Sequence, residues 1–354
     1  MLAAASKWCC VKCFQHKWLA EHVRHQSKKM GACSFCGSGR VSLVDPSQLT
    51  EVFHNVENLY QVGGGETLFD MMQEDWAIFS EKLLASNKAA ALLEEILNAD
   101  WEKDCGYPLY DRGELYSHYA PMGMLESWDE FCYEVRHDPN ASPNFGELFE
   151  EDVHRYGTDL KAGMILYRAR RGYASEEESG RKRPHTGAEI GAPPDGRRVA
   201  GRVNLEGQAV LYCSETARTA VAEVRPATGL CVSVVRVSLN SQLRVLDLGG
   251  DIEEPNPFTE ESLSYWVEFS SLMRAFAFEL ARPLERDDVA SDYLPCQKVA
   301  EWIRTAGFHG IRYPSALNPG GTNIVLFEPG FGDMTESKLV KITDLSIEYE
   351  EAEP

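Results

Sequence analysis

The stretch Ala209-Val-Leu-Tyr-Cys-Ser-Glu-Thr-Ala-Arg-Thr-Ala-Val-Ala-Glu-Val224 decides the fold of the C-terminal half. Its first part, Ala209–Cys213, is a short apolar run that predicts a strand, and Glu215–Val224 follows as a predicted helix. Similar strand-like runs, bounded by Gly, Pro, Asn or Asp, lie at Met164–Ala169, Leu230–Leu239, Arg244–Leu248, Gly310–Tyr313 and Ile324–Phe327. Helices are also predicted at Glu261–Ala281 and Pro295–Ala306. Because strands and helices do not alternate regularly, the pattern favours an α+β domain over a doubly wound parallel sheet.

The chain before this half is more helical. Apolar residues at three- and four-residue spacings over Thr67–Ser86 and Asn87–Ala99 predict helices. Ser127-Trp-Asp-Glu130 has the form of a capping box and predicts the start of another helix. We therefore expect four parts: a four-cysteine zinc-binding module at 1–40, an α-helical domain at 41–156, a mixed α/β domain at 157–330, and a C-terminal strand with an acidic tail at 331–354.

Two Cys-x2-Cys pairs mark the first module. Cys10 and Cys13 form one pair, Cys33 and Cys36 form the other, and nineteen residues separate the pairs. Paired thiolates at this spacing are typical of a tetrahedral zinc site. Since four thiolates leave no open position, we expect a structural zinc ion rather than a catalytic one. The simpler alternative is four reduced cysteines without metal, and weaker ligand candidates nearby are Cys9, His16, His22 and His25.

The composition is that of a globular protein: 44% of the 354 residues are hydrophobic and 25% are charged. The sequence has no run of eighteen apolar residues that could span a bilayer, and Met1–Cys10 lacks the pattern of a signal peptide. We therefore expect a cytoplasmic protein with no membrane partner. In that compartment, the ten cysteines are expected as thiols or metal ligands rather than as disulfides.

The charge is strongly acidic and unevenly distributed. Lys and Arg number 35 against 55 Asp and Glu, which gives a net charge of −20. Residues 1–40 carry +6, and the remainder therefore carries −26. This balance disfavours binding of nucleic acid or anionic lipid by the whole surface. An anionic ligand must therefore meet a local cluster of positive charge.

Residue types suited to chemistry recur around the predicted strand ends: Tyr167, Arg168, Arg202, Tyr212, Glu223, Ser315 and Asn323. Each has a structural explanation when it is taken alone. In their order, however, the segments around them resemble the RES family; these are Leu166–Arg168, Gly201–Gly207, Leu211–Ser214, Thr219–Val224, Gly310–Ser315 and Gly320–Phe327. That family is named for an arginine, a glutamate and a serine, which correspond here to Arg168, Glu223 and Ser315.

The resemblance implies an ADP-ribosyltransferase-like fold and an NAD+-degrading enzyme of the kind found in bacterial toxins and in defence effectors, including phage defence. Such an enzyme cleaves the nicotinamide–ribose bond by phosphorolysis or hydrolysis. Glu223 would stabilise the oxocarbenium-like ribose, because a carboxylate counters positive charge that appears in the transition state. Arg168 and Arg202 suit the pyrophosphate. The catalytic residues implied by the resemblance are Glu223, Arg168, Ser315 and Tyr212.

The resemblance also assigns the remaining residues. Tyr212 is expected to stack on the nicotinamide or the ribose, while Ser315 and Asn323 would hydrogen-bond ligand oxygens from a glycine-bearing turn. The chain departs from the family at Val203, where an aromatic residue is common, and at an insertion over 176–198. This insertion is rich in charge, Gly and Pro and has no apolar periodicity, so it is expected to be mobile.

Other functions are compatible with the sequence. The RES part is also compatible with transfer of ADP-ribose to a protein target. The N-terminal half resembles the HEPN-like domains often fused to RES domains, and HEPN nucleases cleave RNA with an Arg and a His in the spacing of Arg112 and His118; the RES domain would then only bind. We favour a third interpretation, in which the N-terminal half binds a partner or holds the RES domain inactive. Expected partners are NAD+, inorganic phosphate, an antitoxin or trigger protein, and further copies of the chain.

Overall fold

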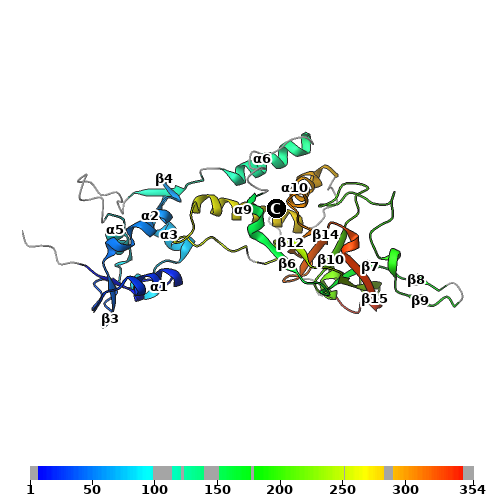
Figure 1. Ribbon diagram of the computed structural model, residues 1–354, viewed down its shortest axis with the longest axis horizontal. Helices are drawn as coiled ribbons and strands as arrows, with labels where there is room; N and C mark the ends of the chain where they lie inside the picture. The colour runs from blue at the N-terminus through cyan, green and yellow to red at the C-terminus, as the bar shows by residue number, and fades with distance from the viewer. Residues whose placement is uncertain are drawn as a thin grey trace, which may run out of the picture. The chain divides into compact units, whose positions relative to one another are not determined.

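A computed structural model of the chain describes residues 7–98, 114–120, 123–138, 151–176, 179–250, 252–282 and 290–345 (Figure 1). Contacts within the chain divide it into two compact units. Unit 1 comprises Met1–Gly123 with Glu254–Ser270, and unit 2 comprises Met124–Glu253 with Ser271–Pro354. Helices occur beside a large mixed sheet, which confirms the predicted α+β class.

Unit 1 combines small antiparallel sheets with short helices. Its three-stranded sheet has the order β1-β3-β2, with β1 at Cys9–Cys10, β3 at Val41–Val44 and β2 at Lys29–Gly31. Strands β4 (Tyr60–Thr67) and β5 (Leu115–His118) form a second antiparallel pair. The helices are α1 (Lys17–Gln26), α2 (Thr50–Glu57), α3 (Leu68–Trp76), α4 (Glu81–Leu84) and α5 (Ala89–Leu97), with single 3-10 turns at Val11–Cys13 and Pro46–Leu49.

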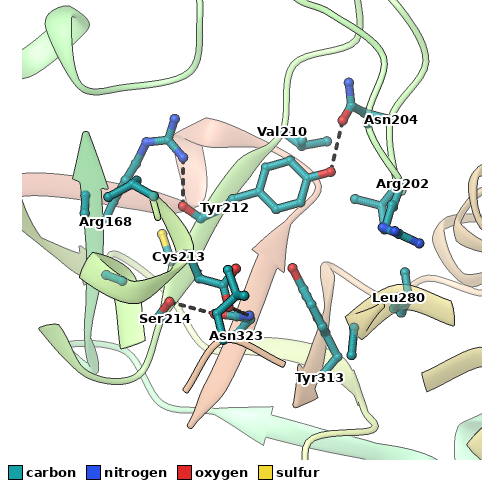
Figure 2. A pocket seen from close by; sticks show the side chains of 18 of the residues that line it. Arg168, Arg202, Asn204, Val210, Tyr212, Cys213, Ser214, Leu280, Tyr313 and Asn323 are labelled. Atoms are coloured by element: carbon teal, nitrogen blue, oxygen red, sulfur yellow. Dashed lines mark hydrogen bonds between the residues drawn. The ribbon is translucent and has the colours of Figure 1, made fainter. Parts of the chain in front are cut away.

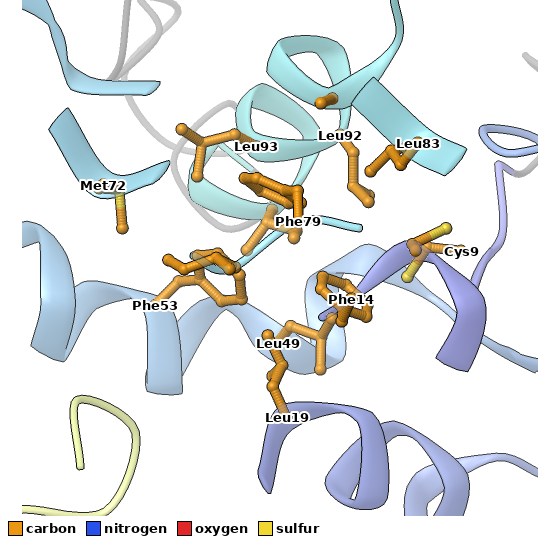
Figure 3. Close-up of a cluster of buried hydrophobic side chains, with 14 of the residues drawn as sticks. Cys9, Phe14, Leu19, Leu49, Phe53, Met72, Phe79, Leu83, Leu92 and Leu93 are labelled. Atoms are coloured by element: carbon orange, nitrogen blue, oxygen red, sulfur yellow. The ribbon is translucent and has the colours of Figure 1, made fainter. Parts of the chain in front are cut away.

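Three phenylalanines form the centre of the unit 1 core (Figure 3). The ring centroid of Phe14 lies 6.4 Å from that of Phe53 and 6.0 Å from that of Phe79, and the Phe53 and Phe79 centroids are 6.3 Å apart. Leu92 and Leu93 of α5 are buried in the same cluster. The apolar positions that predict α5 are therefore the positions that the fold removes from water.

The predicted helical stretch Thr67–Ser86 falls into two helices. Ala77 adopts a left-handed conformation with φ of 46°, and its N–H bonds to the Gln73 carbonyl, which ends α3. Ser80 then caps α4, because its hydroxyl accepts a hydrogen bond from the Leu83 N–H. Turn and cap chemistry thus interrupts an apolar pattern that continues across both helices.

The strand pair β4–β5 lies in a region predicted to be mostly helical. The pairing register shifts between Val62 and Glu66, where three consecutive glycines occur. A Cβ atom on Gly64 would overlap the carbonyl oxygen of Tyr116, so only glycine lets the two strands approach this closely. Sequence patterns associate glycine with turns, which is why this strand was missed.

Unit 2 is organised around an eight-stranded mixed sheet in the order β15-β11-β7-β10-β14-β13-β12-β6. Strands β12 and β13 run parallel, and the other neighbouring pairs are antiparallel. The strands are β6 (Gly157–Leu160), β7 (Ile165–Arg171), β10 (Leu211–Ser214), β11 (Cys231–Leu239), β12 (Leu243–Asp247), β13 (Gly310–Pro314), β14 (Thr322–Leu326) and β15 (Gly332–Lys341). A small antiparallel pair joins β8 (Ala174–Ser175) to β9 (Lys182–Arg183).

The longer helices of the C-terminal half differ little from their predicted ranges. Unit 2 contains α6 (Met124–His137), α8 (Ala217–Glu223) and α10 (Leu294–Thr305), while α9 (Leu263–Ala281) contributes residues to both units. Further 3-10 turns lie at Val153–Tyr156, Gly187–Glu189, Ala290–Tyr293 and Pro329–Phe331. Helix α6 begins before Ser127, so this residue lies inside the helix and not at its cap.

Within the described part of the chain, no helix is long and apolar enough to cross a membrane.

The insertion over 176–198 packs more than its composition indicates. Ile190 is 1% exposed and belongs to the same buried cluster as Leu166 and Leu211. The Glu189 carboxylate accepts two hydrogen bonds from Arg183, at 2.7 and 2.9 Å, and closes a capping box. One buried isoleucine and local polar bonds need no periodicity, which is why the sequence pattern gives no sign of this packing.

Candidate active site

A cavity of about 490 Å³ opens in unit 2 (Figure 2). Strands β7, β10, β13 and β14, helix α8, the end of α9 and the 193–210 segment supply its walls. The described lining residues include one acid, Glu223, and five arginines, which are Arg168, Arg198, Arg202, Arg225 and Arg282. In a chain of net charge −20, these arginines form the local positive cluster that an anionic ligand requires.

Strand register brings four polar residues into one row across the sheet. Ser214 of β10 lies opposite Tyr167 of β7 on one side and opposite Asn323 of β14 on the other, and Asn323 in turn lies opposite Tyr313 of β13. Residues directly opposite each other on neighbouring strands project from the same face. The four residues therefore share the sheet face that borders the cavity.

A half-buried ion-pair group fixes the ends of these strands. The Arg312 Nε donates to Glu215 Oε1 at 2.7 Å, and its Nη1 donates to Asp247 Oδ1 at 2.7 Å. The Glu215 carboxylate raises the pKa of Arg312 above its usual range. Because Glu215 follows Ser214 and Arg312 precedes Tyr313, this pair links β10 and β13, the two strands on either side of β14, beside the cavity.

The carboxylate of Glu223 receives two hydrogen bonds at the edge of the cavity. Ser315 Oγ donates to Glu223 Oε1 at 2.6 Å, and Asn323 Nδ2 donates to the same oxygen at 2.7 Å. Ser214 Oγ donates to Asn323 Oδ1 at 2.7 Å, which fixes the orientation of that amide. The structure thus brings three predicted site residues together, and both bonds are made to one oxygen of the carboxylate, Oε1, rather than to Oε2.

The turn between β13 and β14 packs against α8, the helix that ends in Glu223. Asn318 Nδ2 donates to Thr219 Oγ1 at 3.0 Å, and the Asn318 N–H donates to Ser315 Oγ at 3.1 Å. A Cβ atom on Gly321 would lie 2.6 Å from Thr219 Oγ1, so the absence of a side chain permits this approach. The predicted glycine-bearing turn therefore places Ser315 within reach of the carboxylate.

Tyr212 forms one wall of the cavity, and its hydroxyl group is used within the protein. It donates to Asn204 Oδ1 at 3.1 Å, while Asn204 Nδ2 donates to the carbonyls of Val199 and Leu205. Burial raises the pKa of Tyr212 to about 12, so the phenol stays neutral. Gln297 completes the arrangement, because its Nε2 donates to the Gly201 and Asn204 carbonyls.

Arg168 makes hydrogen bonds to main-chain carbonyls. Its Nε donates to Ile190 at 2.6 Å, its Nη1 to Tyr212 at 2.8 Å and its Nη2 to Gly191 at 3.3 Å. Burial lowers the pKa of its guanidinium. Arg168 therefore ties β7 to β10 and to the packed part of the insertion, an attachment that its sequence context does not indicate.

The other predicted phosphate ligand, Arg202, lies across the cavity from Arg168 (Figure 2). Its Nη1 donates to the Glu279 carbonyl, and its guanidinium carbon lies 5.6 Å from the centre of the Tyr293 ring. Val203, where an aromatic residue was expected from the family pattern, is 2% exposed and also lines the cavity. Arg202 is thus anchored to the last turns of α9 while it borders the cavity.

Several residues of the site were not singled out from the sequence. Ser214, Asn204 and Tyr313 lie in the motifs quoted for the resemblance, and all three line the cavity; strand register explains the positions of Ser214 and Tyr313. In the HEPN-type pair of Arg112 and His118, Arg112 lies outside the described residues. His118 ends strand β5, where its Nε2 lies 2.8 Å from Asp75 Oδ2.

The four predicted zinc ligands converge in unit 1. The sulfur atoms of Cys10, Cys13, Cys33 and Cys36 all lie within 4.8 Å of one another, and all four side chains are buried. Neighbouring Sγ atoms are 3.4 to 3.9 Å apart. Tetrahedral zinc with Zn–S bonds of ~2.3 Å requires sulfur separations of ~3.8 Å. The donor set and its spacing therefore fit a closed zinc site.

The surroundings of the cysteine cluster also suit thiolates. The Cys36 N–H donates to Cys33 Sγ at 3.4 Å, and Ser38 Oγ, which lies 3.2 Å from Cys36 Sγ, accepts a hydrogen bond from Lys82 Nζ. Cys9, a weaker candidate, is directed instead to the Val44 carbonyl at 3.6 Å.

Comparison with known proteins identifies the domain that holds the cavity. The model of the RES domain matches residues 165–348. The crystal structure of the M. tuberculosis MbcT–MbcA toxin–antitoxin complex is similar at 16% sequence identity, covering 55% of this chain and 92% of that chain with a TM-score of 0.31. No curated protein matches the chain. The matched family region contains the whole cavity lining and leaves the cysteine cluster outside.

Proposed function

The chain belongs to the RES domain family, and on that premise we propose that the unit 2 cavity binds NAD+ and that the protein cleaves its nicotinamide–ribose bond. One observation carries this proposal: an acid oriented by Ser315 and Asn323 faces a cavity whose remaining charged lining is arginine. NAD+ contains a ribose that becomes cationic during cleavage and a pyrophosphate that is anionic. A site that binds it therefore needs both a carboxylate and arginines.

Glu223 is proposed to act on the ribose. Departure of nicotinamide leaves positive charge on the sugar, and a fixed carboxylate stabilises that charge more than it stabilises the ground state. Ser315 and Asn323 both donate to Oε1, so Oε2 is the atom that would accept a ribose hydroxyl. In this arrangement Ser315 and Asn323 hold the carboxylate in place and do not need to touch the sugar.

The pyrophosphate is assigned to the arginines. Arg202 remains a candidate for direct contact because it borders the cavity beside the end of α9. Arg168 is proposed to add positive charge to the cavity while its N–H groups hold the wall around Tyr212 and Ile190. Guanidinium groups suit both tasks, since their planar donors serve carbonyls and phosphates alike.

The acceptor of the ADP-ribosyl group is tested by product analysis. Purified protein is incubated with NAD+ with and without inorganic phosphate, and the products are identified by mass. We expect release of nicotinamide together with ADP-ribose phosphate when phosphate is present, or ADP-ribose when water is the acceptor. A protein-linked ADP-ribose would support the transferase alternative, and absence of nicotinamide release would contradict the proposal.

We further propose a toxin or defence role with a restraining partner. An enzyme that consumes NAD+ in its own cell must be held inactive, either by a separate antitoxin or by unit 1. Expression of the full chain and of its Glu223→Gln variant in bacteria tests this. Growth arrest with loss of cellular NAD+ only for the wild-type chain supports the role, and equal growth with unchanged NAD+ contradicts it for a chain that is active when purified.

A structural zinc ion in unit 1 completes the proposal. The buried Cys10, Cys13, Cys33 and Cys36 would hold it, and a closed shell of four thiolates stabilises a fold without supplying an open position for chemistry. The ion would stabilise the three-stranded sheet, because β1 ends at Cys10 and the segment between β2 and β3 carries Cys33 and Cys36. Reaction chemistry is assigned to unit 2 alone.

A further inference from the structure

Tyr313 presents a hydroxyl group to the cavity without a partner in the protein. Its ring is held on β13, where the backbone pairs with Asn323. Within the described part of the chain its hydroxyl makes no hydrogen bond, yet the oxygen is not sealed in the core, because the residue lines the cavity. Figure 2 shows this oxygen on the side of the ring that faces Tyr212.

The neighbouring phenol gives the contrast that makes this unusual. The Tyr212 hydroxyl donates to Asn204 and is therefore committed to the cavity wall. The hydroxyls of Ser214 and Ser315 are likewise committed, to Asn323 and to Glu223. Tyr313 lies beside these residues, and its hydroxyl donates no hydrogen bond within the described part of the chain.

The surroundings of Tyr313 keep its phenol protonated. Burial raises the pKa of Tyr313 well above its ordinary value, and the nearby Tyr212 and Glu223 raise it further. The phenol is therefore neutral at physiological pH and can act as a donor. Tyr313 lines the cavity, where its hydroxyl is open to solvent, and a ligand that displaces this solvent must supply an acceptor to keep the hydroxyl hydrogen-bonded.

We propose that Tyr313 donates a hydrogen bond to an oxygen of the phosphoribosyl part of the substrate, between the ribose at Glu223 and the phosphate at Arg202. This inference rests on the proposed function and adds a substrate-contacting residue to it. The assignment follows from the lining of the cavity, which holds Tyr313 together with Glu223 and Arg202. A ligand that lacks an acceptor oxygen there would leave the phenol unpaired and would be discriminated against.

The substitution Tyr313→Phe tests the inference because it removes the hydroxyl and keeps the ring. We expect the affinity for ADP-ribose, measured by calorimetry, and kcat/KM for NAD+ to fall about tenfold. The thermal midpoint should stay equal, since the hydroxyl makes no hydrogen bond within the described part of the protein that the variant could lose. Loss of binding with retained stability is the signature that a merely structural role would not produce.

Two matched variants control this experiment. Tyr212→Phe removes a hydroxyl that is bonded to Asn204, so it should lower the thermal midpoint. Tyr133→Phe makes the same change on the surface of α6, where the side chain is 64% exposed, and should leave binding and stability unchanged. A fall in stability of Tyr313→Phe equal to that of Tyr212→Phe would show a hydrogen bond within the protein and overturn the inference.

The outcomes separate this inference from the proposed function. If the wild-type protein consumes NAD+ and Tyr313→Phe binds ADP-ribose and turns over NAD+ within twofold of it, the inference is overturned and the proposed function stands. If the wild-type protein neither binds ADP-ribose nor releases nicotinamide, both are overturned. A tenfold loss confined to Tyr313→Phe supports the inference.

Discussion

At the scale of single residues, Glu223 provides the most direct test of the proposed mechanism. Glu223→Gln keeps an oxygen that can accept the bonds from Ser315 and Asn323, and it replaces the charged second oxygen with a neutral NH2 group. We expect nicotinamide release to fall by about a hundredfold or more, while ADP-ribose binding and the thermal midpoint change little. Turnover within a few-fold of wild type at equal folded fraction would remove Glu223 from the mechanism.

Arg168 has both a proposed ligand role and an observed structural one. Arg168→Ala removes three hydrogen bonds to carbonyls, so we expect a lower thermal midpoint together with weaker NAD+ binding. Arg168→Lys should restore each property only in part, because one ammonium cannot reach carbonyls on both sides of the strand. Arg218→Ala, at an exposed position of α8, is the control and should match wild type. Unchanged stability in Arg168→Ala would contradict the anchoring role.

The residue scale also shows the limit of sequence reasoning. Arg168, Glu223 and Ser315 follow from a resemblance in residue order, and the structure places Glu223 and Ser315 in direct contact. The hydrogen bond from Arg168 to the carbonyl of Ile190 could not be predicted from residue order. Ser214 and Tyr313 enter the site through cross-strand register, which depends on distant pairings that local patterns do not encode.

At the scale of elements, short strands with branched and aromatic residues were predicted well, and their order in the sheet was not. Strand β7 pairs with β10 and β11, and β10 pairs with β14, which lies more than a hundred residues later. Turn chemistry explains the other differences. The left-handed Ala77 divides one apolar pattern into two helices, and the glycines at 63–65 conceal a strand.

The turn between β13 and β14 provides a prediction at this scale. In Gly321→Ala, the added methyl would lie 2.6 Å from Thr219 Oγ1 and from Asn318 Nδ2, so the turn must move away from α8. We expect reduced NAD+ consumption with a modest loss of thermal stability, since Ser315 would lose its position beside Glu223. Gly250→Ala meets no atom within 4 Å and is the matched control. Equal activity of both variants would show that the turn tolerates displacement.

At the scale of the whole molecule, the α+β class was predictable because strand and helix signals persist over long stretches. Which segments of the chain belong to each unit was less predictable. Glu254–Ser270 belongs to unit 1 although it follows β12 in the sequence, and Phe258 packs there against Phe53 at a centroid distance of 5.5 Å. A return of the chain to an earlier unit leaves no periodic signal, because the contacts are made by a few aromatic side chains.

The separation into units leads to the final prediction, which concerns zinc. The cysteine cluster lies in unit 1 and the proposed catalytic cavity lies in unit 2, each with its own buried cluster. We expect one zinc per chain by elemental analysis. Zinc contributes about 10–16 kcal/mol to the folding of small zinc modules, so loss of one thiolate should unfold the sheet of unit 1.

Cys10→Ser should therefore lose zinc and the calorimetric transition of unit 1, while unit 2 keeps its own transition and its ADP-ribose affinity. Cys9→Ala is the matched control, because Cys9 neighbours Cys10 but its sulfur is directed to the Val44 carbonyl and not into the cluster. That variant should retain one zinc.

If Cys9→Ala lost the metal and Cys10→Ser kept it, the ligand set would be Cys9, Cys13, Cys33 and Cys36. If neither wild type nor variants held metal after purification with zinc present, four reduced thiols would be the correct description, and the stability of unit 1 would rest on the packing around Phe14, Phe53 and Phe79 alone.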